Sequence, residues 1–266
     1  MWRTRNPAPC YAVAMSFARV RLQVESGVAA LTLSGADAGN AIDEVMAAEL
    51  REALCDLDDR PDVVVVVLTG DGPNFCRGSA LPVDPSAERM AAHSVASSIA
   101  GMGKPTVAAI EGDALDQGLE LALACDVRVV GSQARLGMTQ AAAGCLPWDG
   151  GTQRLPRLVG RSRALEMLLM ARVMSGQEAA AAGLAAEVTA PGRALERAMD
   201  AARVISTHGP LALRYLKEAV YKGADLSLEQ AMRMEVDLAT LLHSTRDRAE
   251  GLRAFAGKRR PEFTGE

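Results

Sequence analysis

The sequence predicts a fold of the α/β class, in which a core of alternating strands and helices is followed by an all-helical C-terminal part. Residues 63–70 form a continuous β-branched run, and residues 104–112 contain a second apolar stretch, as is typical of strands buried on both faces of a parallel sheet. Between such runs the apolar residues recur with helical spacing. After about residue 200 only helical patterns remain.

The elements can be assigned in chain order from their periodicity. Residues 20–26 alternate apolar and polar side chains, and 27–35 follow as a hairpin partner with the turn near Gly27. Residues 44–57 have helical spacing, and a capping box is expected where Ser175 precedes Glu178 by three residues. The other expected elements are a turn-rich loop at 71–82, strands at 126–131, 134–138 and 185–190, and helices at 85–102, 175–183, 193–206, 210–222, 227–245 and 246–258.

We expect three segments along the chain. Residues 1–15 form a poorly ordered N-terminal extension, and Met15 is an alternative start. Residues 16–200 form the α/β core, and residues 201–266 form a C-terminal helical oligomerisation region.

Composition excludes several classes of function. The 266 residues are 49% hydrophobic and only 3% aromatic, so a sizeable core must consist of Ala, Val and Leu. A net charge of −4 gives no general attraction to nucleic acid or to anionic membranes. The five cysteines are scattered, without metal-ligand spacing. The sequence therefore predicts a cytoplasmic protein without a metal site, a membrane span or nucleic-acid binding.

Two loops are placed where chemistry could occur. Residues 74–80 and 112–118 each follow a buried strand and lead into a helix, and backbone N–H groups at helix starts can stabilise a developing oxyanion. Gly78 and Gly118 allow close backbone approach there. The alternative is that both glycines only serve tight turns. Dinucleotide, phosphate-loop and serine-nucleophile motifs are incomplete or missing.

Six segments, in order, resemble one family, the crotonase superfamily of enoyl-CoA hydratases and isomerases. The resemblance covers nearly all of residues 16–264, and the GGTQRLPR block is highly specific. The matching segments are "GNAID" (39–43), "VVVVLTGDGPNFCRGSAL" (64–81), "KPTVAAIEGDALDQGLELALACDVRVV" (104–130), "GGTQRLPRLVGRSRALEMLLMA" (150–171), "SGQEAAAAGLAAEV" (175–188) and "DRAEGLRAFAGKRRPEF" (247–263).

This resemblance implies a crotonase-like spiral of ββα units followed by a helical trimerisation region, assembled as a homotrimer or a dimer of trimers. It implies a coenzyme A thioester as substrate, with no further cofactor. The thioester oxygen would lie between the backbone N–H groups that match Ser79 and Gln117. The family usually has Ala or Gly at both positions. The residues expected to bind substrate are Arg77, Gly78, Asp116, Gly118, Trp148 and Lys258.

One of the family's two catalytic glutamates is replaced in this sequence. Hydratases of the family use two glutamates on one water; Glu120 matches the first, and Gln140 stands where the second is expected. An amide can orient a water but cannot relay a proton. Asp149 and Asp116 are the nearest spare carboxylates. Asp149 lies one position from an extra acid of the family's isomerases. Each aspartate is alternatively a helix cap, Asp149 for a helix near Gly150 and Asp116 for the helix beginning at Gln117.

Three functions remain open at this point. The first, which we favour, is hydration with Glu120 as the main acid/base. The second is a related enolate reaction, decarboxylation or double-bond isomerisation, and the third is non-catalytic acyl-CoA binding. An interaction scaffold that uses the C-terminal helices is a further alternative. Trp148 is large where the family is usually small, which favours a compact or flat acyl group.

Overall fold

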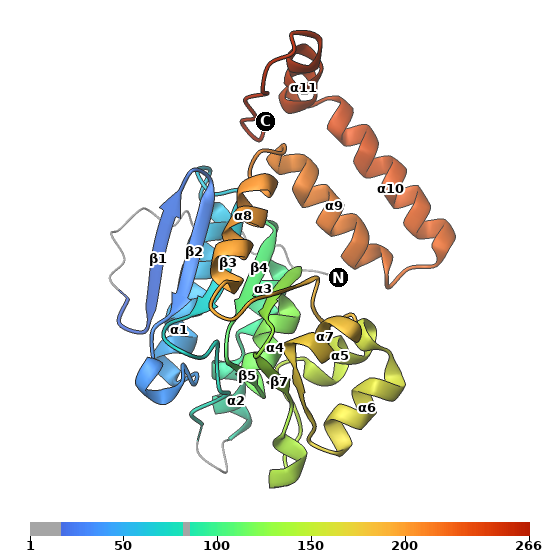
Figure 1. Cartoon of the computed structure of the whole chain (residues 1–266). Helices are drawn as coiled ribbons and strands as arrows, with labels where there is room; N and C mark the ends of the chain where they lie inside the picture. The colour runs from blue at the N-terminus through green and yellow to red at the C-terminus, as the bar shows by residue number, and fades with distance from the viewer. Residues whose placement is uncertain (1–16, 82–85) are drawn as a thin grey trace.

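The computed structural model describes residues 17–81 and 86–266 (Figure 1). The N-terminal extension expected over residues 1–15 lies outside the described residues. Within them, no helix is long and apolar enough to cross a membrane.

A six-stranded sheet forms the centre of the molecule, with the strand order β1-β2-β3-β4-β6-β9. Its strands are β1 (Val20–Glu25), β2 (Val28–Leu33), β3 (Val65–Gly70), β4 (Thr106–Ile110), β6 (Val127–Gly131) and β9 (Glu187–Thr189). The β1–β2 pair is antiparallel and every later pair is parallel. Ser26 and Gly27 turn this hairpin with φ of 51° and 81°, which confirms the predicted turn. The parallel pairing confirms the prediction from the continuous apolar runs.

A second, three-stranded sheet lies beside the first, with the order β5-β7-β8. Its strands are β5 (Asp113–Leu115), β7 (Arg135–Gly137) and β8 (Val173–Ser175). Sequence patterns indicated β7 but not β5 or β8. This small sheet matters for function because β5 leads directly into the helix that carries Glu120.

Helices precede, separate and follow the strands along the chain. They are α1 (Glu44–Asp59), α2 (Ala87–His93), α3 (Ala96–Gly101), α4 (Gln117–Ala124), α5 (Gly151–Val159), α6 (Arg161–Leu169), α7 (Gly176–Ala181), α8 (Ala194–Ile205), α9 (Pro210–Gly223), α10 (Leu228–His243) and α11 (Arg246–Ala256), with short 3₁₀ turns η1 (Ala36–Ala38) and η2 (Gln140–Ala143). The capping box from Ser175 to Glu178 is confirmed at α7.

The single helix expected over residues 85–102 is wrong. The chain forms α2 and α3 with a break at Ser94 and Val95. The break has a tertiary cause: the carboxylate of Asp149 accepts hydrogen bonds from the backbone N–H groups of Val95 and Ala96 at 3.0 and 3.2 Å. Because Asp149 satisfies these two N–H groups, they need no carbonyl of α2 as acceptor. The chain can therefore leave α2 and start a new helix here.

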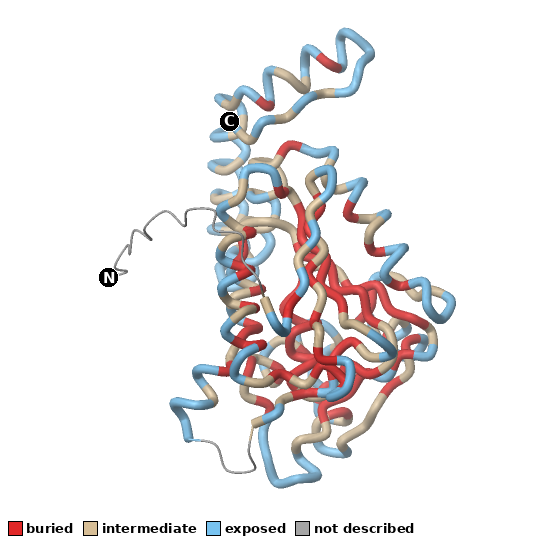
Figure 2. Tube along the Cα trace, turned by 90° about the vertical axis from the view of Figure 1, so that its left-hand side faces the viewer, coloured by how far each residue is buried: buried red, intermediate tan, exposed pale blue. Residues whose placement is uncertain are grey.

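The two faces of the central sheet pack against different helices. Val65 and Val67 of β3 lie in one apolar cluster with Ala198 and Ala202 of α8. Alternate residues of the same strands pack in the larger cluster with α1, α3 and α4, as the period of two in a strand requires. Figure 2 shows this buried material concentrated in the body of the molecule.

The C-terminal helices project away from this body (Figures 1 and 2). α8 runs across the expected boundary at residue 200 and packs on the sheet, whereas α9 and α10 bury none of their residues in this chain. Large apolar side chains are exposed on both, namely Leu216, Val220, Leu228, Met232 and Val236. The strands, helices and parallel order together give the α/β fold that the sequence predicted.

Candidate active site

Helix α4 brings the predicted site residues to one end of β5, against the loop that follows β3. Cys76 in this loop pairs with the strand: its N–H donates to Asp113 O at 2.8 Å, and its carbonyl accepts from Leu115 N at 3.0 Å. A Cβ on Gly118 would lie 2.1 Å from the Cys76 oxygen. Gly118 therefore serves a close backbone approach, as predicted. Gly78 has a φ of 115°, which favours glycine in the same loop.

The two backbone N–H groups expected to hold an oxyanion come from these adjoining segments. Gln117 is the first residue of α4, so its N–H lacks an acceptor within the helix. The neighbours of Ser79 pair with Ile42, through Ile42 N to Gly78 O and Ala80 N to Ile42 O. Within the described residues, neither the Ser79 nor the Gln117 N–H has an acceptor. Both remain available to a ligand.

Glu120 is completely buried one turn into α4. Its Oε1 accepts hydrogen bonds from the N–H groups of Asp149 and Gly151, both at 2.8 Å. Its Oε2 is also buried, yet no donor contacts it in the described part of the chain. Burial raises the pKa of Glu120 from 4.5 to about 7, although the two N–H donors oppose the shift. A carboxyl with this pKa can both accept and donate a proton near neutrality.

Gly151 is required where the end of the PWDGG segment meets Glu120. A Cβ at this position would lie 3.0 Å from Glu120 Oε1 and 2.6 Å from the terminal methyl of Met138. This residue also begins α5, so its N–H is free to donate to the carboxylate. The GGT triplet at residues 150–152 belongs to the family-specific block of the sequence. The contact of Gly151 with Glu120 is seen only in the folded structure.

Asp149 is buried and accepts four hydrogen bonds. Its Oδ1 accepts from Ser94 Oγ at 2.6 Å, and its Oδ2 accepts from Gln117 Nε2 at 3.0 Å and from two N–H groups at the start of α3. The suggestion that Asp149 caps the helix near Gly150 is therefore wrong. Asp149 accepts from the N–H groups at the start of α3, whereas α5 begins at Gly151 and its N-cap residue, Gly150, makes no side-chain cap hydrogen bond. Ser94, which sequence reasoning missed, completes this arrangement.

Asp116 anchors the segment that carries Gln140. It occupies the N-cap position of α4, but its side chain makes no cap hydrogen bond to that helix, so the suggested cap is wrong. Its Oδ1 instead accepts from the backbone N–H of Thr139 at 2.5 Å and from the Thr139 hydroxyl at 3.0 Å. With Met138 against Gly151, this contact holds residues 138–140 beside the start of α4.

Gln140 begins η2, and its Oε1 is buried without a donor. The described residues contain six such buried side-chain atoms, and three of them are Gln117 Oε1, Glu120 Oε2 and Gln140 Oε1. Buried oxygens normally have a hydrogen-bond partner. Gln117 and Glu120 lie on α4, and Gln140 follows Thr139, which contacts Asp116 at the start of that helix. Unsatisfied acceptors on these residues indicate a candidate place for a ligand that supplies donors.

The remaining predicted residues lie at the margin of this site or away from it. Arg77 is half-exposed and its Nε pairs with the buried Asp113 carboxylate at 2.8 Å. Trp148 is partly buried directly before Asp149. Lys258 is exposed just after α11, on the projecting helices, and none of its described contacts reaches the site within this chain.

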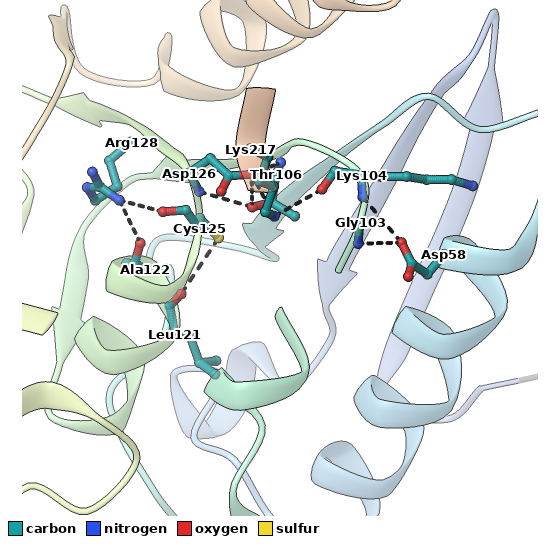
Figure 3. Close-up of polar contacts among 10 residues, drawn as sticks. All are labelled: Asp58, Gly103, Lys104, Thr106, Leu121, Ala122, Cys125, Asp126, Arg128 and Lys217. Atoms are coloured by element: carbon teal, nitrogen blue, oxygen red, sulfur yellow. Dashed lines mark hydrogen bonds and ion pairs between the residues drawn. The ribbon is translucent and has the colours of Figure 1, made fainter. Parts of the chain in front are cut away.

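Charged residues hold the other end of α4 (Figure 3). The buried Arg128 guanidinium donates from Nη1 to the carbonyl of Cys125 at 2.6 Å and from Nε to the carbonyl of Leu184 at 2.6 Å. A cation at a helix C-terminus is favourable. Next to it, Lys217 of α9 pairs with Asp126 at 2.9 Å. No pattern in the sequence indicated these contacts, which hold the helix that carries Glu120.

No cluster of three or more His, Cys, Asp or Glu side chains within residues 17–81 and 86–266 has the arrangement of a metal site. The chemistry available to these residues is a buried carboxyl with one free oxygen, two free backbone donors and a neutral amide.

Known proteins resemble the chain along most of its length. The family model described as enoyl-CoA hydratase/isomerase matches residues 23–266. A mitochondrial methylglutaconyl-CoA hydratase of Mus musculus is 37% identical over 90% of this chain and 80% of its own. An (E)-benzylidenesuccinyl-CoA hydratase of Thauera aromatica is 36% identical over 92% of this chain and 99% of its own.

Solved structures agree with this assignment. An enoyl-CoA hydratase from Bacillus anthracis superposes with a TM-score of 0.89 at 33% identity, covering 93% of this chain and 100% of that one. A second, from Geobacillus kaustophilus, gives 0.87 at 36% identity, covering 94% and 99%. With the sequence match and the α/β architecture in agreement, this chain belongs to the enoyl-CoA hydratase/isomerase family of the crotonase superfamily and is an enzyme of the enoyl-CoA hydratase type.

Proposed function

We propose that this enzyme adds water across the double bond of a 2-enoyl-CoA thioester, with Glu120 as its principal acid/base. The observation that carries the proposal is the state of the Glu120 carboxyl. One oxygen is fixed by two backbone N–H groups, and the other is buried and free. This geometry leaves one oriented oxygen for proton transfer.

The thioester oxygen is assigned to the N–H groups of Ser79 and Gln117. Negative charge moves onto this oxygen when a nucleophile adds to the β-carbon, and preorganised N–H donors stabilise it there. Both groups are free among the described residues. Because they belong to the backbone, the unusual side chains at these positions leave the donors in place. Gly78 and Gly118 keep the two segments close enough to act together.

The attacking water is assigned to the space between Glu120 and Gln140. A water molecule has two hydrogens, and the free Glu120 Oε2 and Gln140 Oε1 are two acceptors of the kind it needs. Gln140 then orients the water, while only Glu120 exchanges a proton with it. Asp149 is unsuited to be the second acid because four donors already occupy its oxygens.

A single glutamate suffices for the whole proton path. Ionised Glu120 accepts one hydrogen of the water while the water oxygen bonds to the β-carbon, and the electron pair of the double bond moves into the thioester to give the enolate. The protonated Glu120 then donates that proton to the α-carbon, and the enolate returns to the thioester. Water is added in full and Glu120 ends ionised as it began. Its pKa of about 7 suits both transfers.

The acyl-CoA is proposed to enter past Arg77, with Trp148 limiting the acyl group and Lys258 contacting a coenzyme A phosphate from a neighbouring subunit. The exposed apolar faces of α9 and α10 support assembly into a homotrimer or a dimer of trimers, because apolar patches on projecting helices are usually covered by a partner. We further propose that the protein acts in the cytoplasm and needs no cofactor besides its thioester substrate.

A second candidate is decarboxylation or double-bond isomerisation of an acyl-CoA. The observation in its favour is that only one carboxyl of the site has a free oxygen, and these reactions require one proton carrier beside an oxyanion hole. Glu120 would protonate the enolate left after loss of carbon dioxide, or move a proton between the α- and γ-carbons.

The test is incubation of the purified enzyme with crotonyl-CoA, a cyclic enoyl-CoA and methylmalonyl-CoA in deuterated water, followed by mass spectrometry. Hydration predicts the gain of one water with deuterium at the α-carbon, abolished by Glu120→Gln but not by Glu52→Gln, an exposed position on α1. Loss of carbon dioxide, or deuterium uptake without added water, would replace hydration by the second candidate.

A further inference from the structure

The side chain of Gln117 is a buried polar group that the proposed mechanism does not use. It is 1% exposed at a position where only the backbone N–H is needed. Its Nε2 donates to the carbonyl of His93 at 2.8 Å and to Asp149 Oδ2 at 3.0 Å. Both amide hydrogens are thus engaged between the end of α2 and the start of α3.

These two partners fix the orientation of the amide. A carbonyl oxygen and a carboxylate oxygen that already receives backbone N–H bonds act only as acceptors. Rotating the amide would place Gln117 Oε1 against both of them and leave its NH₂ unpaired. The Oε1 atom must therefore face away from His93 and Asp149, where it is buried and meets no donor in the described residues.

The Gln117 side chain lies next to Glu120, the proposed acid/base, on α4. Gln117 and Glu120 are three residues apart, so their side chains lie on the same face of the helix, one turn from each other. Asp149 contacts both, through its carboxylate to Gln117 and through its N–H to Glu120. A thioester placed as in the proposed function, with its oxygen at the Gln117 N–H and its double bond at Glu120, would have its acyl chain near this amide.

A fixed, buried acceptor discriminates between acyl chains. A plain hydrocarbon chain leaves Gln117 Oε1 unpaired, whereas a chain with a hydroxyl group supplies the missing donor. Leaving a buried acceptor unpaired lowers affinity by about tenfold or more.

We propose that Gln117 is a specificity-determining residue that selects acyl-CoA substrates whose acyl chain carries a neutral hydrogen-bond donor, such as a hydroxyl group. The inference rests on the proposed function for the placement of the thioester. It goes beyond that function by naming the chemical class of the acyl group. Asp149 acts as a positioning residue in this scheme, because it holds the amide in the selecting orientation.

The experiment measures binding with thioesters that cannot react. Pairs of saturated acyl-CoA molecules of four, five and six carbons, identical except for a terminal hydroxyl, are titrated into the full-length protein by calorimetry. The variants are Gln117→Leu and Gln117→Met, which keep the volume but remove the acceptor. Gln153→Leu is the matched control, because the Gln153 side chain is exposed and, among the described residues, donates only to its neighbour Thr152.

In the unaltered protein, we expect at least one hydroxylated chain to bind about tenfold more tightly than its plain partner. The ratio should fall to about one in both Gln117 variants and persist in Gln153→Leu. If every hydroxylated acyl-CoA binds the unaltered protein no more tightly than its plain partner, the proposal is overturned. A preference for the hydroxylated partner that persists in both Gln117 variants would also overturn it.

Failure of the proposed function gives a different result. If no enoyl-CoA is hydrated but the hydroxyl preference depends on Gln117, hydration is wrong and the assignment of Gln117 stands. If crotonyl-CoA is hydrated in a Glu120-dependent way but the binding ratios are all near one, the inference on Gln117 fails alone. Folding of each variant is checked by thermal melting, and the two substitutions at Gln117 guard against loss of one to misfolding.

Discussion

Replacing Glu120 with glutamine removes the ionisable group while keeping the shape of the side chain and an oxygen for the N–H groups of Asp149 and Gly151. In the folded protein the pKa of Glu120 is raised from 4.5 to about 7, chiefly by burial. A carboxyl with a raised pKa favours the fold while it is protonated, so its contribution is fully present below about pH 4.5 and is lost as the pH rises through about 7.

The magnitude follows from the pKa difference. The pKa values differ by 2.5, which is about 7 minus 4.5, and each pKa unit corresponds to about 1.4 kcal/mol, so full ionisation costs the fold about 3 kcal/mol. The Glu120→Gln variant does not have this cost. Between about pH 5 and about pH 9, the free energy of unfolding of the unaltered protein should fall by about 3 kcal/mol relative to the variant.

Urea denaturation at several pH values measures this difference, because other titrating groups contribute equally to both proteins and cancel. Glu52→Gln, on the exposed surface of α1, should give a flat difference over the same range. In parallel, kcat/KM for crotonyl-CoA should rise with a midpoint near pH 7 as Glu120 ionises. A flat stability difference for Glu120→Gln would refute the reasoning that burial sets the state of this carboxyl.

Three further predictions concern neighbouring positions. Gln140→Glu should raise the hydration rate at least about tenfold, because it adds a second group able to exchange protons with the water; an unchanged kcat would show that this position does not contact the water. Gly118→Ala should lower the free energy of unfolding by about 2 kcal/mol or more, because the new Cβ would meet the Cys76 oxygen. Gly101→Ala should not lower it, because no atom lies within 4 Å of a Cβ at that position. Thermal melting of both variants checks this. Trp148→Ala should increase turnover of long-chain enoyl thioesters and leave short ones unaffected, measured by kcat/KM across chain lengths; equal values would exclude Trp148 as the limit of the pocket.

The elements predicted well are those whose sequence pattern reflects burial directly. The β-branched run of β3 and the apolar run of β4 are buried on both faces, and a strand in that position has to be hydrophobic throughout. The β1–β2 hairpin and the α7 capping box follow from local chemistry at Gly27 and Ser175. The errors occurred where a distant residue intervenes, as at the break between α2 and α3.

For the site, the order of residues along the chain is enough to identify the chemical groups: a lone Glu120, a glutamine at 140, and glycines where backbones must meet. What those groups can do depends on the folded arrangement. It buried Glu120 and freed one of its oxygens, turned Asp149 from a candidate acid into an acceptor with four donors, and fixed the Gln117 amide. The physical reason is that pKa and hydrogen-bond state depend on solvent exclusion and on partners distant in sequence, and no local pattern records either.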